Sequence, residues 1–406
     1  MNIILKRPVR ILCVLCILCI SLMLSGCGGW YEQVLDQTLQ SQLNTATILS
    51  DEELYQRAQK EMASGRVLDF YSTTSTAETS AENFMKKYPK LAGKIVYHEI
   101  DDAETYDFLS AEIRRGAGTV DMMLTQNGAD LDTKLIQTGL AYRYFPEQYR
   151  DQVEKNFQLP VAVCLCNTLF IYNNCEGAIK DHNIWQFTEE EWKDQIYFKN
   201  PLDETENTNF LVMLTSPEWT EKIEKAYRNY YGNEWNNGDQ YLSASYEWID
   251  RFLKNCDFNH GSNSQICTSI AEADSGKMGF FVFTKIRKLE EEQRNRLNVM
   301  AYEDDVDCFS GYMYAIYASV ANNADCPYTC ALFINYLLSV EGFSEEGSWN
   351  HYAGYYSANK DVHKETGIND RDFSFWENTL VVEDSDYIQD NMEFVRDFLE
   401  SALKTH

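Results

Sequence analysis

Residues 67–89 read VLDFYSTTSTAETSAENFMKKYP. The first five combine β-branched, aromatic and other apolar side chains, which favours a strand. A run of hydroxyl residues at 72–76 then leads into a helical pattern that stops at Pro89. Two more such units follow, with strands expected at 95–100 and 120–125 and helices at 105–114 and 131–138. This alternation predicts an α/β fold with a mixed, mostly parallel sheet flanked by helices.

The rest of the chain is long enough for a second lobe. The sequence has 406 residues, more than a typical single domain holds. An apolar stretch at 161–172 is too long for one ordinary strand, so we expect it to cross between two lobes. The division that we expect is 65–165 for the first part of lobe 1, 166–300 for lobe 2, and 301–406 for the return to lobe 1 and the C-terminal helices.

The composition restricts the partners. There are 63 acidic and 35 basic residues, which gives a formal net charge of −28. Nucleic acids and anionic lipid surfaces both attract basic patches, so we expect neither to bind the folded body. Solubility is the simplest explanation of the negative charge, and steering of a cationic ligand is the alternative. We expect the protein to be a monomer.

The N-terminus carries an export pattern. A positively charged segment precedes an apolar run at 11–24, which is shorter than the ~20 residues of a membrane-spanning helix. Leu24-Ser25-Gly26-Cys27 follows and resembles the lipobox of bacterial lipoproteins. The resemblance implies that 1–26 is a signal peptide and that Cys27 is lipidated; a simple signal anchor is the alternative. Residues 27–64 would then form the lipidated cysteine, a tether and a leading helix, on the outer face of the cell membrane.

The cysteines after Cys27 allow two interpretations. They are Cys164, Cys166, Cys175, Cys256, Cys267, Cys308, Cys326 and Cys330. Free, buried cysteines that pack as small apolar residues are the simpler interpretation. Cys256 and Cys267 flank a polar loop and are the best candidates for a disulfide in an exported protein. No C-x-x-C pair occurs after Cys27 and no histidine has ligand spacing beside these cysteines, so we expect no metal and no cofactor.

Short patterns follow one another in a fixed order from residue 65 to about residue 345. They are Gly65-x-Val67-x-x-x-Tyr71-Ser72, Phe84-x-x-x-Tyr88-Pro89, Ala111-Glu112 with Gly116 and Val120-Asp121, Leu135 with Gly139-Leu140, Tyr144 and Pro146, Ile171-Tyr172-Asn173, Trp192-Lys193 with Ile196 and Asn200-Pro201, and Ala331 to Leu338 with Glu341. Together they resemble bacterial extracellular solute-binding proteins of ATP-binding-cassette importers. The nearest subgroup is similar to the binders of iron(III), thiamine and other small polar solutes.

The resemblance implies a two-lobed, periplasmic-binding-protein-like clamp of type II. A small polar solute would be held in the cleft between the lobes and delivered to a membrane permease. Iron is not carried over, because iron binders have an adjacent tyrosine pair near the segment Gly279-Phe280-Phe281-Val282-Phe283, and Asn200 stands where they usually have aspartate. The alternatives are a receptor that presents its ligand to a membrane sensor and a surface hydrolase. The sequence has no G-x-S-x-G, H-E-x-x-H or G-x-x-x-x-G-K motif, so we expect no enzyme.

Loops that follow strands supply the candidate binding residues of the first lobe, because ligands of open α/β sheets sit beyond the carboxyl ends of strands. Thr73, Thr74 and Ser75 lie between the first strand and its helix, and helix capping is their alternative role. Gln126 and Asn127 follow the third strand, and a turn is the alternative there.

The remaining candidates lie later in the chain and are Thr205, Thr208, Asn209, Tyr172, Phe281 and Tyr355. The first three open a helix beside three acidic residues, which would suit a cation or a polyol; a solvated loop is the alternative. The aromatic candidates could stack against the ligand, with core packing as the alternative for Tyr172 and Phe281 and a packed lobe surface for Tyr355. We therefore expect a small polar, neutral or cationic solute.

Overall fold

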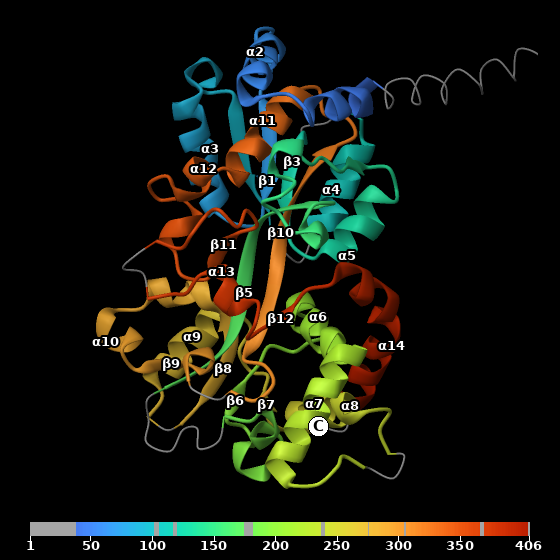
Figure 1. The fold of residues 1–406 in the computed structure, drawn as a ribbon, viewed down its shortest axis with the longest axis vertical. Coiled ribbons are helices and arrows are strands. Elements are labelled where there is room, and N and C mark those ends of the chain that lie inside the picture. Colours follow the sequence, from blue (N-terminus) through green and yellow to red (C-terminus); the bar gives the residue numbers. More distant parts are fainter. Residues whose placement is uncertain are drawn as a thin grey trace, which may run out of the picture.

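The computed structural model describes residues 38–100, 105–116, 120–173, 182–236, 240–274, 276–303, 306–365 and 369–404. The export pattern and Cys27 lie outside these residues. Within them, no helix has both the length and the apolar character that crossing a membrane requires. The described chain forms one mixed sheet, in the order β2-β1-β3-β10-β5-β8-β6-β7, with helices packed around an upper and a lower half (Figure 1).

The upper half is built by the alternation that the sequence predicts. β1 (Leu68–Ser72) lies between β2 (Ile95–Glu99) and β3 (Met122–Thr125), and all three are parallel. The helices of this half are α2 (Asp51–Met62), α3 (Thr76–Lys87), α4 (Thr105–Arg114), α11 (Pro327–Leu338) and α12 (Val340–Ser344). The third expected helix differs, because a short α5 (Gly128–Asp130) runs directly into a π-helical turn at Leu131–Ile136.

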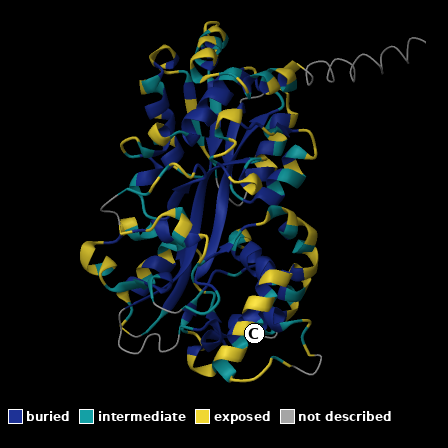
Figure 2. Ribbon diagram, viewed as in Figure 1, coloured by how far each residue is buried: buried dark blue, intermediate teal, exposed yellow. Residues whose placement is uncertain are grey.

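Two long antiparallel strands join the halves. β5 (Val161–Asn173) and β10 (Gly311–Ala321) run side by side through the centre of the molecule (Figure 1). The crossing expected at 161–172 is confirmed, although as a single strand of 13 residues. β5 can be this long because it has partners along both edges: β10 and then β9 (Leu297–Val299) on one side, and β11 (Tyr355–Ser357) and then β8 (Met278–Val282) on the other. Every residue of β5 and β10 is buried (Figure 2).

The lower half packs helices around β8, β6 (Ile196–Tyr197) and β7 (Cys256–Asp257), which are parallel to one another. Its helices are α6 (Thr205–Leu214), α7 (Pro217–Tyr231), α8 (Ala244–Asn255), α9 (Asn263–Glu272) and α10 (Glu291–Arg294). Aromatic rings fill this core; Phe170 of β5, for example, lies 4.8 Å from Phe280 of β8 between ring centroids. Such tilted ring pairs add to the free energy that the buried apolar area supplies.

The C-terminal segment returns to both halves. After α11 and α12 it adds β11 to β5, then α13 (Phe373–Trp376) and β12 (Val381–Val382), which pairs with β10. The last helix, α14 (Ser385–Lys404), packs on α6, α8 and α5 (Figure 1). A short strand, β4 (Ala141–Tyr142), pairs with the other end of β10.

The disulfide considered for Cys256 and Cys267 does not form. Both thiols are free and buried, in β7 and in α9. Burial raises the pKa of the Cys256 thiol well above its ordinary value, and burial also raises that of Cys267 to about 12, so neither is a reactive thiolate. The simpler interpretation, that these cysteines pack as apolar residues, agrees with their positions. Cys175 lies outside the described residues.

Candidate functional site

A cleft lies between the two halves. Its outer part, here called the outer chamber, has a volume of about 450 Å³. A smaller inner chamber of about 100 Å³ lies next to it, towards β5 and β10. Six residues line both chambers, so the two form one continuous site: Thr73, Gln126, Glu204, Glu206, Asn263 and Lys285.

The upper wall of the cleft is made by the loops that follow β1 and β3. Thr73 and Thr74 come after β1, and the Gln126 side chain donates to Thr73 Oγ1 at 3.4 Å. Asn127 has a positive φ of 60° and is the N-cap of α5: its Oδ1 accepts from the backbone N–H of Asp130. Carboxyl ends of parallel strands meet at one edge of the sheet, which is why Thr73 and Gln126, 53 positions apart in the sequence, share this wall. The wall is rich in neutral hydroxyl and amide groups.

The lower wall is made by the first turns of α6 and α9, and it carries charge. Glu204 precedes α6, and Glu206 lies in its first turn. Lys199, which is 6 % exposed, forms an ion pair with Glu204. Ser262 caps α9 by accepting from the backbone N–H of Gln265 at 3.2 Å, and this start of the helix lines the outer chamber.

The back of the inner chamber is formed by the hinge strands and by Tyr355 of β11. The Tyr355 hydroxyl lies 3.4 Å from Thr74 Oγ1, so β11 touches the upper wall. Burial raises the pKa of Tyr355 to about 12, which keeps the hydroxyl neutral at physiological pH. Thr168 of β5 also lines this chamber; it is 2 % exposed, and its hydroxyl has no hydrogen-bond partner among the described residues.

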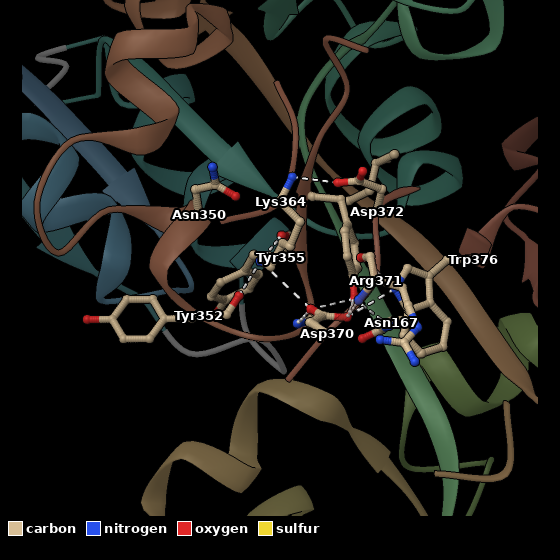
Figure 3. Close-up of polar contacts among 12 residues, drawn as sticks. Asn167, Asn350, Tyr352, Tyr355, Lys364, Asp370, Arg371, Asp372 and Trp376 are labelled. Atoms are coloured by element: carbon tan, nitrogen blue, oxygen red, sulfur yellow. Dashed lines mark hydrogen bonds and ion pairs between the residues drawn. The ribbon is translucent and has the colours of Figure 1, made fainter. Parts of the chain in front are cut away.

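A buried network holds Tyr355 in place (Figure 3). Asp370 accepts from the backbone N–H of Gly354 at 2.8 Å and from the hydroxyl of Tyr356 at 2.7 Å, so both neighbours of Tyr355 are bound to one carboxylate. Lys364 Nζ donates to the Tyr355 carbonyl at 2.7 Å and lies 3.8 Å from Asp370 Oδ2. Burial raises the pKa of Asp370 and lowers that of Lys364, and the attraction between the two charges opposes both shifts.

Six of the candidates from the sequence line the cleft. They are Thr73, Thr74, Gln126, Asn127, Thr205 and Tyr355. Their contact with a ligand stays a prediction, but the loops chosen from strand ends and from the start of α6 do meet in one cavity.

The other five candidates do not line it. Ser75 is exposed at the start of α3. Phe281 is fully buried in the core, and the Tyr172 hydroxyl donates to Glu303. Thr208 and Asn209 lie on the buried side of α6, where Asn209 Nδ2 donates to Asn127 Oδ1 at 3.4 Å across the two halves. Phe281, Thr208 and Asn209 are therefore part of the interior, whereas Ser75 faces solvent.

Sequence reasoning missed several residues of the cleft. Lys285, Asn263 and Thr168 were not considered, and Asp107 at the start of α4 also lines the outer chamber. The serine cap before α9 was a usable signal, because it marks a helix start after a strand in the same way as the loop at 72–76. A threonine inside the apolar run of β5 was a second signal. Nothing near Lys285 in the sequence marked it out.

Among the described residues, one group of acidic and cysteine side chains has the spacing of a metal site: Asp121, Asp325 and Cys326. It lies just before β3, at the end of the strand opposite the cleft. Asp121 accepts from the backbone N–H groups of Asp69 at 2.9 Å and Asp325 at 3.2 Å, so its oxygens already have partners. This group therefore explains how the loops at that edge are held together.

Comparison with known proteins identifies the fold. No protein-family model and no curated protein matches the sequence. The iron- and citrate-bound IdiA (FutA) of Trichodesmium matches with a TM-score of 0.59 and 13 % identity, over 83 % of this chain and 99 % of that one. Iron-bound HitA of Pseudomonas aeruginosa gives 0.58 and 13 %, over 83 % and 99 %. AfuA of Actinobacillus pleuropneumoniae, a periplasmic binding protein with bound fructose-6-phosphate, gives 0.56 and 15 %, over 84 % and 98 %. The two-lobed periplasmic-binding-protein fold expected from the sequence is confirmed.

Proposed function

We propose that this chain is an extracellular solute-binding lipoprotein, which captures a small polar solute between its halves and delivers it to the permease of an ATP-binding-cassette importer. The observation that carries the proposal is the cleft: loops from both halves line it, and the hinge strands β5 and β10 cross behind it. Closure of the halves around a solute would exclude water and change the surface that a permease meets.

The structural neighbours support this role through their fold. Those described above bind iron with citrate, iron, or a sugar phosphate, so the fold does not determine the solute. The polar groups that this cleft offers to a ligand are mainly hydroxyl, amide and carboxylate groups. We propose binding without chemistry, since the cleft shows no arrangement of a nucleophile with a base among its described residues.

A ligand screen, followed by substitutions in the upper wall of the cleft, tests the proposal. The full-length protein in non-ionic detergent is screened by thermal shift against yeast extract and against a panel of sugars, amines, amino acids, phosphates and metals. A solute at about 100 times its dissociation constant stabilises the folded state by about 2.7 kcal/mol. For the solute that binds, Thr73→Val with Thr74→Val should weaken affinity by about 1–3 kcal/mol, because two hydrogen bonds are lost.

Ser75→Ala is the matched control, because Ser75 belongs to the same hydroxyl run but is exposed and caps nothing. Its affinity should equal that of the wild type. A double valine variant with unchanged affinity would contradict the site, and a screen in which no solute of any class binds would contradict the function.

Anchoring at Cys27 is tested separately. Cys27→Ala should release the protein from the membrane fraction or leave the signal peptide uncleaved, because the acyl chains would have no attachment point. Mass spectrometry of the cell fractions measures both outcomes. A membrane-bound variant with the same mass as the wild type would mean that the lipobox interpretation is wrong.

A further inference from the structure

The floor of the inner chamber is one face of the central sheet. Cys166 and Thr168 of β5 line it, with Val282 of β8 on one side and Tyr314 and Ile316 of β10 on the other. In each of the two long strands the lining residues are two positions apart, as expected for side chains on one face. Cys166, Val282 and Ile316 offer no strong hydrogen-bonding group to a ligand. The Thr168 hydroxyl is therefore a polar group in a largely apolar floor.

This hydroxyl is the observation that points to a ligand. Thr168 is 2 % exposed, and its Oγ1 has no hydrogen-bond partner among the residues that the structure describes. Buried polar groups are nearly always paired, because an unpaired group gives up its bonds to water without replacement. Since Thr168 lines the chamber, a group of the solute is in position to supply the missing bond.

The charges around the inner chamber are already engaged. The charged residues that line it, among those described, are Glu204, Glu206 and Lys285. Glu204 forms an ion pair with Lys199. Glu206 and Lys285, one acidic and one basic, both interact with other groups of the protein. A charged group of the solute would lose its hydration here without gaining a free partner of opposite charge, which is unfavourable in a buried site.

The other polar groups of the chamber suit an uncharged hydroxyl. Thr73 and Thr74 of the upper wall and Tyr355 of the back bring three more hydroxyls to it. The contacts that these hydroxyls make with one another and with Gln126 are long: Thr74 Oγ1 lies 3.4 Å from the Tyr355 hydroxyl, and Gln126 donates to Thr73 Oγ1 at 3.4 Å. A hydroxyl both donates and accepts, so these groups can bind the hydroxyls of a solute without any net charge.

We infer that the solute is an uncharged polyol, such as a sugar, and that one of its hydroxyls binds to Thr168 in the inner chamber. The rest of the solute occupies the outer chamber, where Thr205 and Asn127 continue the neutral polar lining. Asp107 and Asp203 also line the outer chamber, but both are exposed, so water screens their charge. The inference rests on the proposed function, because it names the ligand class of the same cleft.

The experiment separates the two proposals by fractionating one extract. The full-length protein, in a polyoxyethylene detergent that has no sugar headgroup, is mixed with yeast extract, and the shift in melting temperature is measured. The extract is then passed over a mixed bed of cation and anion exchangers, which removes amines, carboxylates, phosphates and metal ions. Half of the deionised extract is treated with periodate, which cleaves the bond between adjacent hydroxyl-bearing carbons. The other half is treated with iodate, and both reagents are removed on the same resin.

The outcomes have distinct meanings. The expected result is a shift that is kept after the ion exchangers and after iodate, and is lost after periodate. A shift that is lost on the ion exchangers shows a charged solute, and a shift that survives periodate shows a neutral solute without adjacent hydroxyls. Each of these two results overturns the polyol while the proposed function stands. No shift with the untreated extract contradicts both proposals.

Variants of Thr168 test the site with the deionised extract, and the dilution that gives half of the maximal shift serves as the measure of affinity. Thr168→Val should weaken binding about threefold to tenfold, while the melting temperature without solute does not fall, because the hydroxyl has no partner to lose. Thr168→Ser keeps the hydroxyl and should bind within about twofold of the wild type.

Ser319→Ala is the matched control. Ser319 of β10 is also buried with an unpartnered hydroxyl within the described chain, but it lines neither chamber, so its loss should leave binding unchanged. Wild-type affinity in Thr168→Val would overturn the site. Equal losses of affinity in Thr168→Val and Thr168→Ser would also overturn it, because they would show that the size of the side chain matters and not its hydroxyl.

Discussion

Two buried carboxylates of the C-terminal segment, Asp370 and Glu383, support the back and the upper wall of the cleft in different ways. Asp370 lies beside Lys364 and binds both neighbours of Tyr355. Glu383 accepts from the backbone N–H groups of Gly128 at 3.2 Å and Ala315 at 2.9 Å, and no ion pair links it to a basic residue of the described chain. The first fixes the back of the inner chamber, and the second fixes α5, next to Asn127.

The difference shows what a partner of opposite charge does in the interior. Burial raises the pKa of Glu383 from its ordinary 4.5 to about 7, although four neutral groups donate to it. For Asp370 the ammonium group of Lys364 works against the same effect of burial. Neutral donors therefore hold a buried carboxylate in position, but they leave its protonation sensitive to pH near neutrality. The support that Asp370 gives should therefore depend on Lys364, and the support that Glu383 gives should depend on pH.

The largest expected effect comes from removing the cation. Lys364→Met leaves Asp370 buried without its ion pair and removes the bonds from Nζ to the carbonyls of Tyr352 and Tyr355. Breaking a buried pair in this way should lower the free energy of unfolding by about 3–5 kcal/mol, measured by urea denaturation. Lys222→Met is the control, because its pair with Glu218 is exposed and should contribute about 0–1 kcal/mol. Equal losses in the two variants would mean that the ion pair does not support the segment.

The second effect is a pH dependence. Because the folded state holds the proton of Glu383 more tightly than the unfolded state, its contribution is favourable below about pH 4.5 and is lost as the pH rises through about 7. The shift corresponds to about 3 kcal/mol between these limits. Asp121, whose pKa burial raises to about 6, acts in the same direction. The whole protein should therefore lose part of its stability between pH 5 and pH 8.

Glu383→Gln isolates the contribution of this residue. The amide cannot ionise, so the difference in unfolding free energy between wild type and variant should change by about 2.5 kcal/mol from pH 5 to pH 8, in favour of the variant at the higher pH. The change with pH is the measured quantity, since the amide also disturbs one of the backbone N–H contacts. A difference that is constant with pH would show that Glu383 ionises normally in the folded protein.

The sequence predicted the parts of the cleft that depend on local patterns. Thr73 and Gln126 follow strands whose composition marks them, and parallel strands bring such loops together. Which side of α6 faces the cleft was harder to predict. Thr205 lines the cleft, but Thr208, one turn later, is buried and donates to the Pro201 carbonyl. Phe281 was misplaced because β8 is buried on both faces, so strand alternation does not point to a ligand.

The supports behind the walls could not be predicted in the same way. Lys364 and Asp370 belong to an irregular segment, and nothing in their spacing shows that they meet under β11. Glu383 reaches Gly128 across 255 positions of the sequence. Contacts of this kind depend on how β5 and β10 bring the C-terminal segment back to the hinge, which only the complete topology defines.

The smallest expected effects come from substitutions of two adjacent tyrosines, Tyr355 and Tyr356. They test whether the Asp370 network contributes to ligand binding or only to the stability of the fold. Tyr355→Phe removes the hydroxyl that faces the inner chamber; its contact with Thr74 is long, at 3.4 Å, so stability should change little. Affinity for the solute should fall by about 0.5–1.5 kcal/mol, the value of one hydrogen bond, as measured by calorimetry.

Tyr356→Phe instead removes the hydroxyl that donates to the buried Asp370 at 2.7 Å. It should lower the free energy of unfolding by about 1–3 kcal/mol with a smaller change in affinity. If Tyr355→Phe lowered stability and left affinity unchanged, Tyr355 would be a packing residue, and the network behind it would have no part in binding.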